Sequence, residues 1–221
     1  FQDVAFDAQG RAWLLDRLAG RKVSVLGPDG RLVAEFPLEG GPVAEGGGVT
    51  GIFLYDDGCW VEIEHGKMTR IATAGMDASE RVVRTGRLSA DGRWLLAGAL
   101  RDRQTAGVFV RPAARPDENP RMLAEVRFDI PVLHLLMLEG TGRSVFLGAQ
   151  VAEFSRVPPY GLERTAIEIV EIGMDGRVLR RIELQAPELE LEQFRPLVLG
   201  KDGKIYQLWF GSEGVELRRA G

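Results

Sequence analysis

Residues 6–36 read FDAQGRAWLLDRLAGRKVSVLGPDGRLVAEF and decide the fold. Two turn signals, Asp7-Ala-Gln-Gly10 and Pro28-Asp29-Gly30, separate short apolar runs. Glycine adopts the positive φ of a tight turn without steric penalty, and Asp-Gly between apolar runs is a strong hairpin signal. After the second turn, apolar residues alternate with more polar ones, which predicts a strand with one wetter face. The expected strands are Val4–Phe6, Ala12–Leu15, Val23–Leu26 and Leu32–Leu38.

Four antiparallel strands within about forty residues are typical of one blade of a β-propeller. The stretch also resembles the NHL-type propeller repeat. In that repeat an aspartate and a glycine precede a short apolar strand, an aspartate follows it, and an arginine opens the third strand. Gly10, Asp16 and Arg21 occupy the matching positions. The resemblance covers residues 3–38 well and the remainder loosely, and it implies an NHL-like, six-bladed-type β-propeller repeat protein.

Weaker copies of the same strand-and-turn unit recur along the chain. The clearest copy lies 146 residues further on (175 − 29), where Asp175-Gly176 matches Asp29-Gly30. At that spacing the apolar positions of the two strands coincide: Leu32, Phe36 and Leu38 fall on Val178, Ile182 and Leu184. We therefore predict an all-β fold, namely a β-propeller of about five visible blades, each a four-stranded antiparallel sheet. These blades form either a complete ring or part of a larger one. An irregular β-sandwich or barrel is the alternative fold.

The expected blades form a single domain over residues 1–221, at approximately 1–39, 48–75, 84–126, 131–186 and 195–221. The last unit shows three strands and no fourth. Because an open sheet edge is a liability, we expect residues before Phe1 or another chain to supply the missing strand. Phe1 itself is expected to be a processed or an excised start.

Two segments outside the clearest strands are interpreted from their composition. The glycine-rich residues 39–48 lack the Gly-Lys-Ser/Thr end of a phosphate-binding loop, which predicts a flexible link. Residues 187–193, where glutamate alternates with leucine, are expected to be a helical turn or an edge strand.

Composition excludes several function classes. The chain has 221 residues, with 28 basic and 32 acidic side chains and a net charge of −4. Nucleic-acid binders usually carry a basic excess or stripe, so no nucleic-acid partner is expected. No apolar run approaches the roughly 20 residues of a membrane span, so no membrane insertion is expected. The single cysteine, Cys59, excludes an internal disulfide and is expected to be a small buried thiol.

Catalytic constellations are not evident. The chain has two histidines, His65 and His134, which cannot supply a three-histidine metal site. His65 beside a glycine is expected in a turn, and His134 within an apolar run is expected in the core. Ser144 lacks the closing glycine of a nucleophile elbow. Propeller enzymes such as lactonases hold calcium with carboxylates and amides around a central channel, but Asn119 is the only asparagine. We therefore predict no catalytic residue, no metal site and no cofactor.

The best candidate for recognition is an insertion at Val151–Arg164, where loops on a rigid scaffold often carry binding residues. Its candidate binding residues, which surround a proline pair, are Phe154, Arg156, Tyr160 and Arg164. By contrast, Arg101–Gln104 is expected to be an exposed hairpin tip.

Repeated aspartates and tryptophans are interpreted structurally. The aspartates that precede turn glycines are expected to cap those turns by side-chain hydrogen bonds; they are Asp7, Asp29, Asp57, Asp91, Asp175 and Asp202. Trp13, Trp60 and Trp94 each follow a turn glycine by two or three residues and are expected at repeated packing positions between blades.

These observations favour a non-catalytic β-propeller scaffold that presents loops to a protein or other ligand. The resemblance to propeller repeat proteins, and not any residue, implies a larger bacterial protein of the periplasm or cell envelope. The first alternative is a hydrolase or lactonase-like propeller enzyme with a carboxylate-bound metal in its central channel. The second is a structural fragment completed by a strand from a partner.

Overall fold

The computed structural model describes residues 3–17, 20–38, 49–80, 82–187, 196–200 and 202–220. Residues 39–48 and most of 187–193, for which a link and a helical turn or edge strand were predicted, lie outside them. The described residues contain no helix, and therefore none long and apolar enough to cross a membrane. The chain divides into two compact units, Phe1–Arg87 and Leu88–Gly221. Each unit is described by itself.

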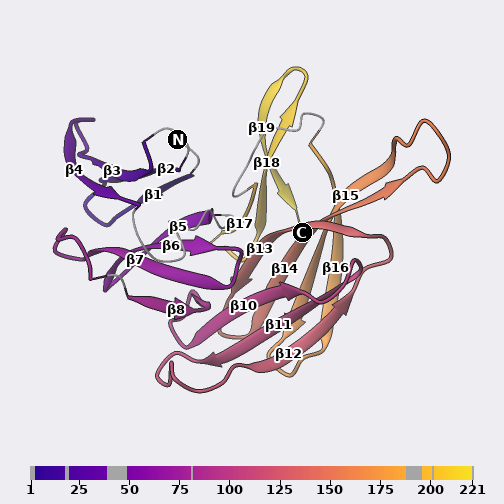
Figure 1. Ribbon diagram of the computed structural model, residues 1–221, viewed down its shortest axis with the longest axis horizontal. Helices are drawn as coiled ribbons and strands as arrows, with labels where there is room; N and C mark the ends of the chain where they lie inside the picture. Colours follow the sequence, from indigo (N-terminus) through magenta and orange to yellow (C-terminus); the bar gives the residue numbers. More distant parts are fainter. Residues whose placement is uncertain are drawn as a thin grey trace. The chain divides into compact units, whose positions relative to one another are not determined.

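The strands form five separate antiparallel sheets, each built from consecutive strands (Figure 1). The first unit contains two four-stranded sheets: β1 (Asp3–Phe6), β2 (Ala12–Asp16), β3 (Lys22–Leu26) and β4 (Leu32–Pro37), then β5 (Val49–Tyr55), β6 (Gly58–Ile63), β7 (Lys67–Thr73) and β8 (Val83–Thr85). The division between the units falls within the short strand β9 (Arg87–Leu88), which begins the third sheet with β10 (Trp94–Leu100), β11 (Thr105–Pro112) and β12 (Arg121–Arg127).

The second unit continues with two more sheets. The fourth consists of β13 (Val132–Gly140), β14 (Ser144–Phe154), β15 (Leu162–Gly173) and β16 (Val178–Gln185). The fifth has three described strands, β17 (Leu197–Leu199), β18 (Ile205–Gly211) and β19 (Gly214–Ala220).

The predicted fold class is confirmed: the chain is all-β, with five consecutive blade-like sheets of the β-propeller type. Small sheets of consecutive strands differ from the two large sheets of a sandwich and from the closed sheet of a barrel. The structure also adds β8 to the second sheet, outside the predicted blade 48–75. That strand has three residues and lacks a strong apolar pattern, so composition alone did not indicate it.

The predicted internal repeat is confirmed at the level of hydrogen bonds. β4 and β16 are the fourth strands of their sheets. The N–H of Gly27 donates to the carbonyl of Arg31 at 2.8 Å. The equivalent bond 146 residues further on (173 − 27) runs from the N–H of Gly173 to the carbonyl of Arg177, at 2.9 Å. Each strand pair also has a register shift at the equivalent place, next to Leu26 in one sheet and Ile172 in the other.

In the first unit, the two sheets share one apolar core. Its fully buried members come from both sheets and include Leu15, Val23, Val25, Ile52, Cys59, Val61 and Ile71. Trp13 belongs to this core and stacks on Phe36, with ring centroids 5.8 Å apart. The Asp3 carboxylate also accepts a hydrogen bond of 2.8 Å from the backbone N–H of Ile52, which joins β1 to β5. Burying both inner faces together provides the hydrophobic stabilisation that an isolated small sheet lacks.

In the second unit, the fourth sheet packs on both sides. One apolar cluster joins it to the third sheet and includes Val108, Val110, Phe128, Leu138, Leu147 and Val170. Trp94 packs against this cluster, as expected for a packing position. A second cluster joins the fourth sheet to the fifth and includes Met137, Phe146, Ile167, Ile169, Leu197 and Ile205. β14 and β15 are therefore held between neighbouring sheets over most of their length.

Candidate functional site

The predicted binding residues lie at the free end of a long two-stranded ribbon formed by β14 and β15, which extends away from the rest of the sheet (Figure 1). β13 pairs with β14 only as far as Val151, and β16 pairs with β15 only as far as Ala166. Beyond these points β14 and β15 continue to pair with each other up to Phe154 and Leu162. Among the described strands, no third strand accompanies this end of the ribbon.

The prediction of a loop insertion at Val151–Arg164 needs correction. Most of that segment is strand, and only Ser155–Gly161 forms the connecting loop. The loop is closed by a hydrogen bond of 2.8 Å from the N–H of Ser155 to the carbonyl of Gly161. The Ser155 hydroxyl donates to the carbonyl of Val157 at 3.0 Å. The segment is thus an ordered ribbon tip rather than an irregular excursion.

Apolar side chains are concentrated at this tip. The four large ones are strongly exposed: Phe154 at 51%, Val157 at 66%, Tyr160 at 73% and Leu162 at 49%. Pro158 and Pro159 are exposed beside them. Large apolar side chains gathered in one exposed patch, rather than scattered singly, are typical of an interaction site. We name the end of the ribbon that carries them, residues 154–162, the ribbon tip.

The two predicted arginines occupy different environments. Arg156 is exposed within the loop at the ribbon tip. Arg164 lies on β15, and its Nη2 donates to both carboxylate oxygens of Glu183 on β16, at 3.0 and 3.1 Å. The structure therefore brings Phe154, Arg156 and Tyr160 to one end of the ribbon, whereas Arg164 is engaged with a neighbouring strand.

A buried polar cluster in the first unit was not predicted. The Glu62 carboxylate is 1% exposed, and its Oε1 lies 3.2 Å from Nε of Arg87, which is 4% exposed. Its Oε2 accepts a hydrogen bond of 2.8 Å from the hydroxyl of Thr50 and lies 3.2 Å from Nδ1 of His65. Burial by itself would raise the pKa of Glu62, but Arg87, His65 and Thr50 outweigh it and lower that pKa to about 2. Both carboxylate oxygens already have protein partners, which favours a structural role.

Aromatic rings and arginines stack beside this cluster. The Arg87 guanidinium lies 4.5 Å from the ring centroid of Phe53, which stacks on Tyr55 at 6.4 Å. The Arg84 guanidinium lies 4.9 Å from the Tyr55 centroid and 3.9 Å from that of Trp60. Cation–π contacts of this kind stabilise by about 0.5–2 kcal/mol each. Because Trp60 is almost completely buried, the stack supports the sheet and does not offer a stacking surface to a ligand.

Five of the six turn aspartates, all except Asp57, accept a backbone hydrogen bond within their turns, as predicted. The carboxylates of Asp29, Asp175 and Asp202 each accept a hydrogen bond of 3.1 Å from the N–H two residues further on. Asp7 accepts from Gln9 and Arg11 in the same way and also from the Trp13 indole at 3.0 Å. Asp57 accepts from the Trp60 indole at 2.9 Å. These contacts account for the conserved spacing of the motif within the chain without a catalytic role.

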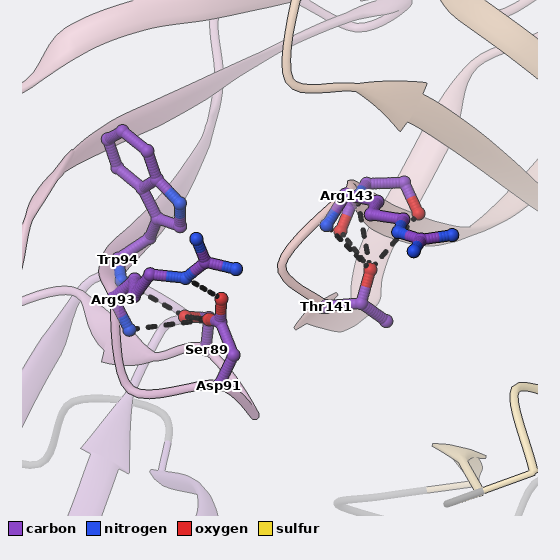
Figure 2. Close-up of polar contacts among 7 residues, drawn as sticks. Ser89, Asp91, Arg93, Trp94, Thr141 and Arg143 are labelled. Atoms are coloured by element: carbon purple, nitrogen blue, oxygen red, sulfur yellow. Dashed lines mark hydrogen bonds and ion pairs between the residues drawn. The ribbon is translucent and has the colours of Figure 1, made fainter.

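Figure 2 shows one aspartate-capped turn and one threonine-capped turn in the second unit. The Ser89 hydroxyl donates to Asp91 at 2.7 Å, and Asp91 pairs with Arg93 at 2.5 Å. In the other turn, the Thr141 hydroxyl oxygen accepts from the N–H groups of Arg143 and Ser144, at 3.2 and 3.1 Å. Burial opposes the ionisation of Asp91, but Ser89 and Arg93 outweigh it, so that its pKa is lowered.

The two turns are in contact. The N–H of Ala90 donates to the carbonyl of Gly140 at 2.8 Å. A Cβ at Gly142 would lie 2.5 Å from the Asp91 carboxylate and 2.6 Å from the Arg93 guanidinium, so a larger residue there would displace these two side chains. Ser144 takes part in this turn, which explains its side chain without a nucleophilic role.

Of the two histidine predictions, the one for His65 is confirmed and the one for His134 is wrong. His65 lies in the turn between β6 and β7 with φ of 50°, as predicted for a turn residue, although it is also buried against Glu62. His134 was predicted in the core, and this is wrong, since it is exposed. Register shifts flank it, between Val132 and His134 and between Leu135 and Met137, and they interrupt the alternation that the apolar run implies.

The predictions for Cys59 and for the hairpin tip after β10 are confirmed. Cys59 is fully buried, and burial raises the pKa of its thiol. Arg101–Arg103 form an exposed tip between β10 and β11. Within the described residues, no group of three or more His, Cys, Asp or Glu side chains could hold a metal ion.

No protein-family model matches the chain, and no curated protein matches it. The candidate function therefore depends on the residues and geometry of this chain itself.

Proposed function

We propose that this chain is a non-catalytic β-propeller scaffold that binds a protein partner through the ribbon tip. The observation that carries the proposal is the ribbon itself. Beyond Val151 on β14 and before Ala166 on β15, the two strands pair only with each other among the described strands. Their shared end presents apolar side chains to solvent. The packed part is rigidly held between two apolar clusters, which gives the tip a fixed base.

The composition of the ribbon tip supports a protein partner. Aromatic residues and arginine are enriched at the centre of protein interfaces and at their energetic hot spots, and Phe154, Tyr160 and Arg156 are of these types. The paired strands limit the conformational entropy lost on binding. Arg164 has a supporting role here, because its ion pair with Glu183 links the ribbon to β16.

The finer assignments are also proposals. The NHL-like relationship is supported by the turn geometry of the first sheet: Gly10 has φ of 74°, and Asp16 accepts a hydrogen bond of 2.9 Å from the N–H of Gly20. The metal-dependent hydrolase alternative has no converging set of ligands in its favour among the described residues.

The test is photocrosslinking followed by affinity measurement. A benzoyl-phenylalanine at position 160 should crosslink one protein in cells that produce the full-length protein. The same group at position 179 is the control, since Leu179 on β16 is similarly exposed. With that partner purified, Tyr160→Ser and Phe154→Ser should raise Kd at least tenfold, about 1.4 kcal/mol. Leu179→Ser and Arg164→Ala should change Kd less. Equal crosslinking at positions 160 and 179, or an unchanged Kd for both tip variants, would refute the proposal.

A second candidate function has its own observation. The fifth sheet has three described strands where the other four sheets have four, and β19 is at its edge. A strand donated by a partner, or by residues before Phe1, would complete it.

A further inference from the structure

β19 is an unusual edge strand. Within the described residues it pairs only with β18. Beyond the three residues that pair with β17, the β18–β19 hairpin continues as a projecting two-stranded ribbon (Figure 1). The outer edge of β19 therefore presents backbone N–H and carbonyl groups that no described strand receives.

The other outer strands are blunted in ways that discourage edge-to-edge pairing. β8 has only three residues. β4, β12 and β16 each pair through a register shift, which twists an edge locally. β19 is seven residues long, contains no proline, and pairs with β18 in an unbroken register. A long, regular and partly apolar edge is a template for another strand.

The side chains of β19 divide by face. Val215 and Leu217 point to one face and are 59% and 71% exposed. Glu216 and Arg218 point to the other face and form an ion pair of 2.8 Å. Arg218 also lies over the Trp209 ring, 3.5 Å from its centroid, which fixes the position of this charge.

This pattern is self-complementary in one register. Cross-strand neighbours must share a face, so two antiparallel copies of β19 can be related only by a two-fold axis through a residue position. An axis at Leu217 is the register that places Glu216 of each copy opposite Arg218 of the other. It also places the two Leu217 side chains together and each Val215 beside the stem of Arg219.

We infer that β19 pairs with β19 of a second copy of this chain, antiparallel and centred on Leu217. The inference deepens the second candidate function, since it identifies the partner strand. The pairing joins two three-stranded sheets into one of six strands. Two Glu216–Arg218 cross-strand contacts set the register, and the Leu217 contact removes the most exposed apolar side chain of the strand from water.

The first test is sedimentation velocity on the full chain over micromolar to sub-millimolar concentrations. The wild type should shift from monomer to dimer. Leu217→Lys should weaken the dimer at least tenfold, because it places two ammonium groups together at the axis. Leu179→Lys adds the same charge at an exposed position of β16 and should have no effect. A wild type that stays monomeric at every concentration, or a dimer insensitive to Leu217→Lys, would overturn the inference.

The second test reads the register. Leu217→Cys should give a covalent dimer with a short bifunctional thiol reagent, because directly opposed Cβ atoms are about 4.5–5.5 Å apart, slightly more than the roughly 3.5–4.5 Å of a disulfide. Leu179→Cys should not, and Cys59 is too buried to compete. Glu216→Arg should weaken the dimer, and the double variant Glu216→Arg with Arg218→Glu should restore it. A crosslink at position 179 but not at 217 would contradict the pairing.

A third result separates the inference from the candidate function on which it rests. If the chain stays monomeric but is stabilised by an added extended peptide, the open edge accepts a strand and the second copy is not its occupant. In that case the inference fails and completion by a partner strand stands. Neither result bears on the ribbon tip, which lies on other strands.

Discussion

Replacing Glu62 by glutamine tests whether the buried polar cluster stabilises the first unit. In the folded chain, burial opposes the charge of Glu62, yet Arg87, His65 and Thr50 lower its pKa from 4.5 to about 2. A pKa change of this size corresponds to about 3 kcal/mol, because each unit is worth 1.36 kcal/mol. Removing the carboxylate also leaves the Arg87 guanidinium buried without its ion-pair partner, and such losses cost about 3–5 kcal/mol. We expect Glu62→Gln to lower the free energy of unfolding by about 3 kcal/mol at pH 7.

The direction of the Glu62 pKa shift determines how its contribution to the free energy of unfolding changes with pH. Since the pKa of Glu62 is lower in the folded than in the unfolded chain, its contribution is complete above about pH 5 and is lost as the pH falls toward 2. Urea unfolding of wild type and variant between pH 7 and pH 2.5 measures the difference. The two curves should converge as the pH falls.

Two controls make the test specific. Glu64→Gln removes an exposed carboxylate two residues away and should change the unfolding free energy by less than about 0.5 kcal/mol. Glu62→Gln combined with Arg87→Met should recover part of the loss, because no unpaired charge stays buried. A loss below about 1 kcal/mol for Glu62→Gln, or a wild-type advantage that is constant from pH 7 to pH 2.5, would refute the reasoning.

Three further predictions concern turns, thiol and surface. Gly30→Ala should lower the free energy of unfolding by about 1 kcal/mol, because alanine is strained at the positive φ of this position. Gly176→Ala should lower it more, because its new Cβ would also lie 2.5 Å from the Leu123 carbonyl. Thermal unfolding ranks the two variants, and the reverse order would contradict this prediction. Cys59, whose pKa is raised by burial, should resist a thiol reagent at pH 8 until denaturant is added, and rapid native labelling would show that it is accessible. His134→Ala should shift the unfolding free energy by less than about 0.5 kcal/mol, and a larger loss in urea unfolding would place it in the core after all.

The turns and repeats are predictable from sequence because they depend on neighbouring residues. Asp29 and Gly30 determine their turn through a side-chain bond and a positive φ, both of which are local properties. The alternation in β4 identifies a buried face only toward its end, since Phe36 and Leu38 are buried but Leu32 is 58% exposed. These signals suffice for strand order within a sheet and for the fold class.

The candidate sites depend on contacts between distant residues, and this limits prediction. Glu62 alternates with Val61 and Ile63, which resembles a strand with one wet face, yet all six residues of β6 are buried. Its partner Arg87 is 25 residues away (87 − 62), and no local pattern joins them. His134 shows the opposite error, since register shifts in β13 turn it outward. The segment Val151–Arg164 was predicted as a loop insertion, but strand pairing continues through most of it.

The matched turns after β3 and β15 show which part of a sheet determines its own shape. The two hairpins keep the same turn hydrogen bonds and the same displaced pairing, although Phe36 stacks on a tryptophan and its counterpart Ile182 packs against a cluster that contains Met137, Phe146 and Leu197. Because the geometry survives this change of surroundings, it is encoded within the hairpin itself. The same bond closes the turn between β17 and β18, from the N–H of Gly200 to the carbonyl of Lys204 at 2.8 Å, so one local turn serves different strand connections.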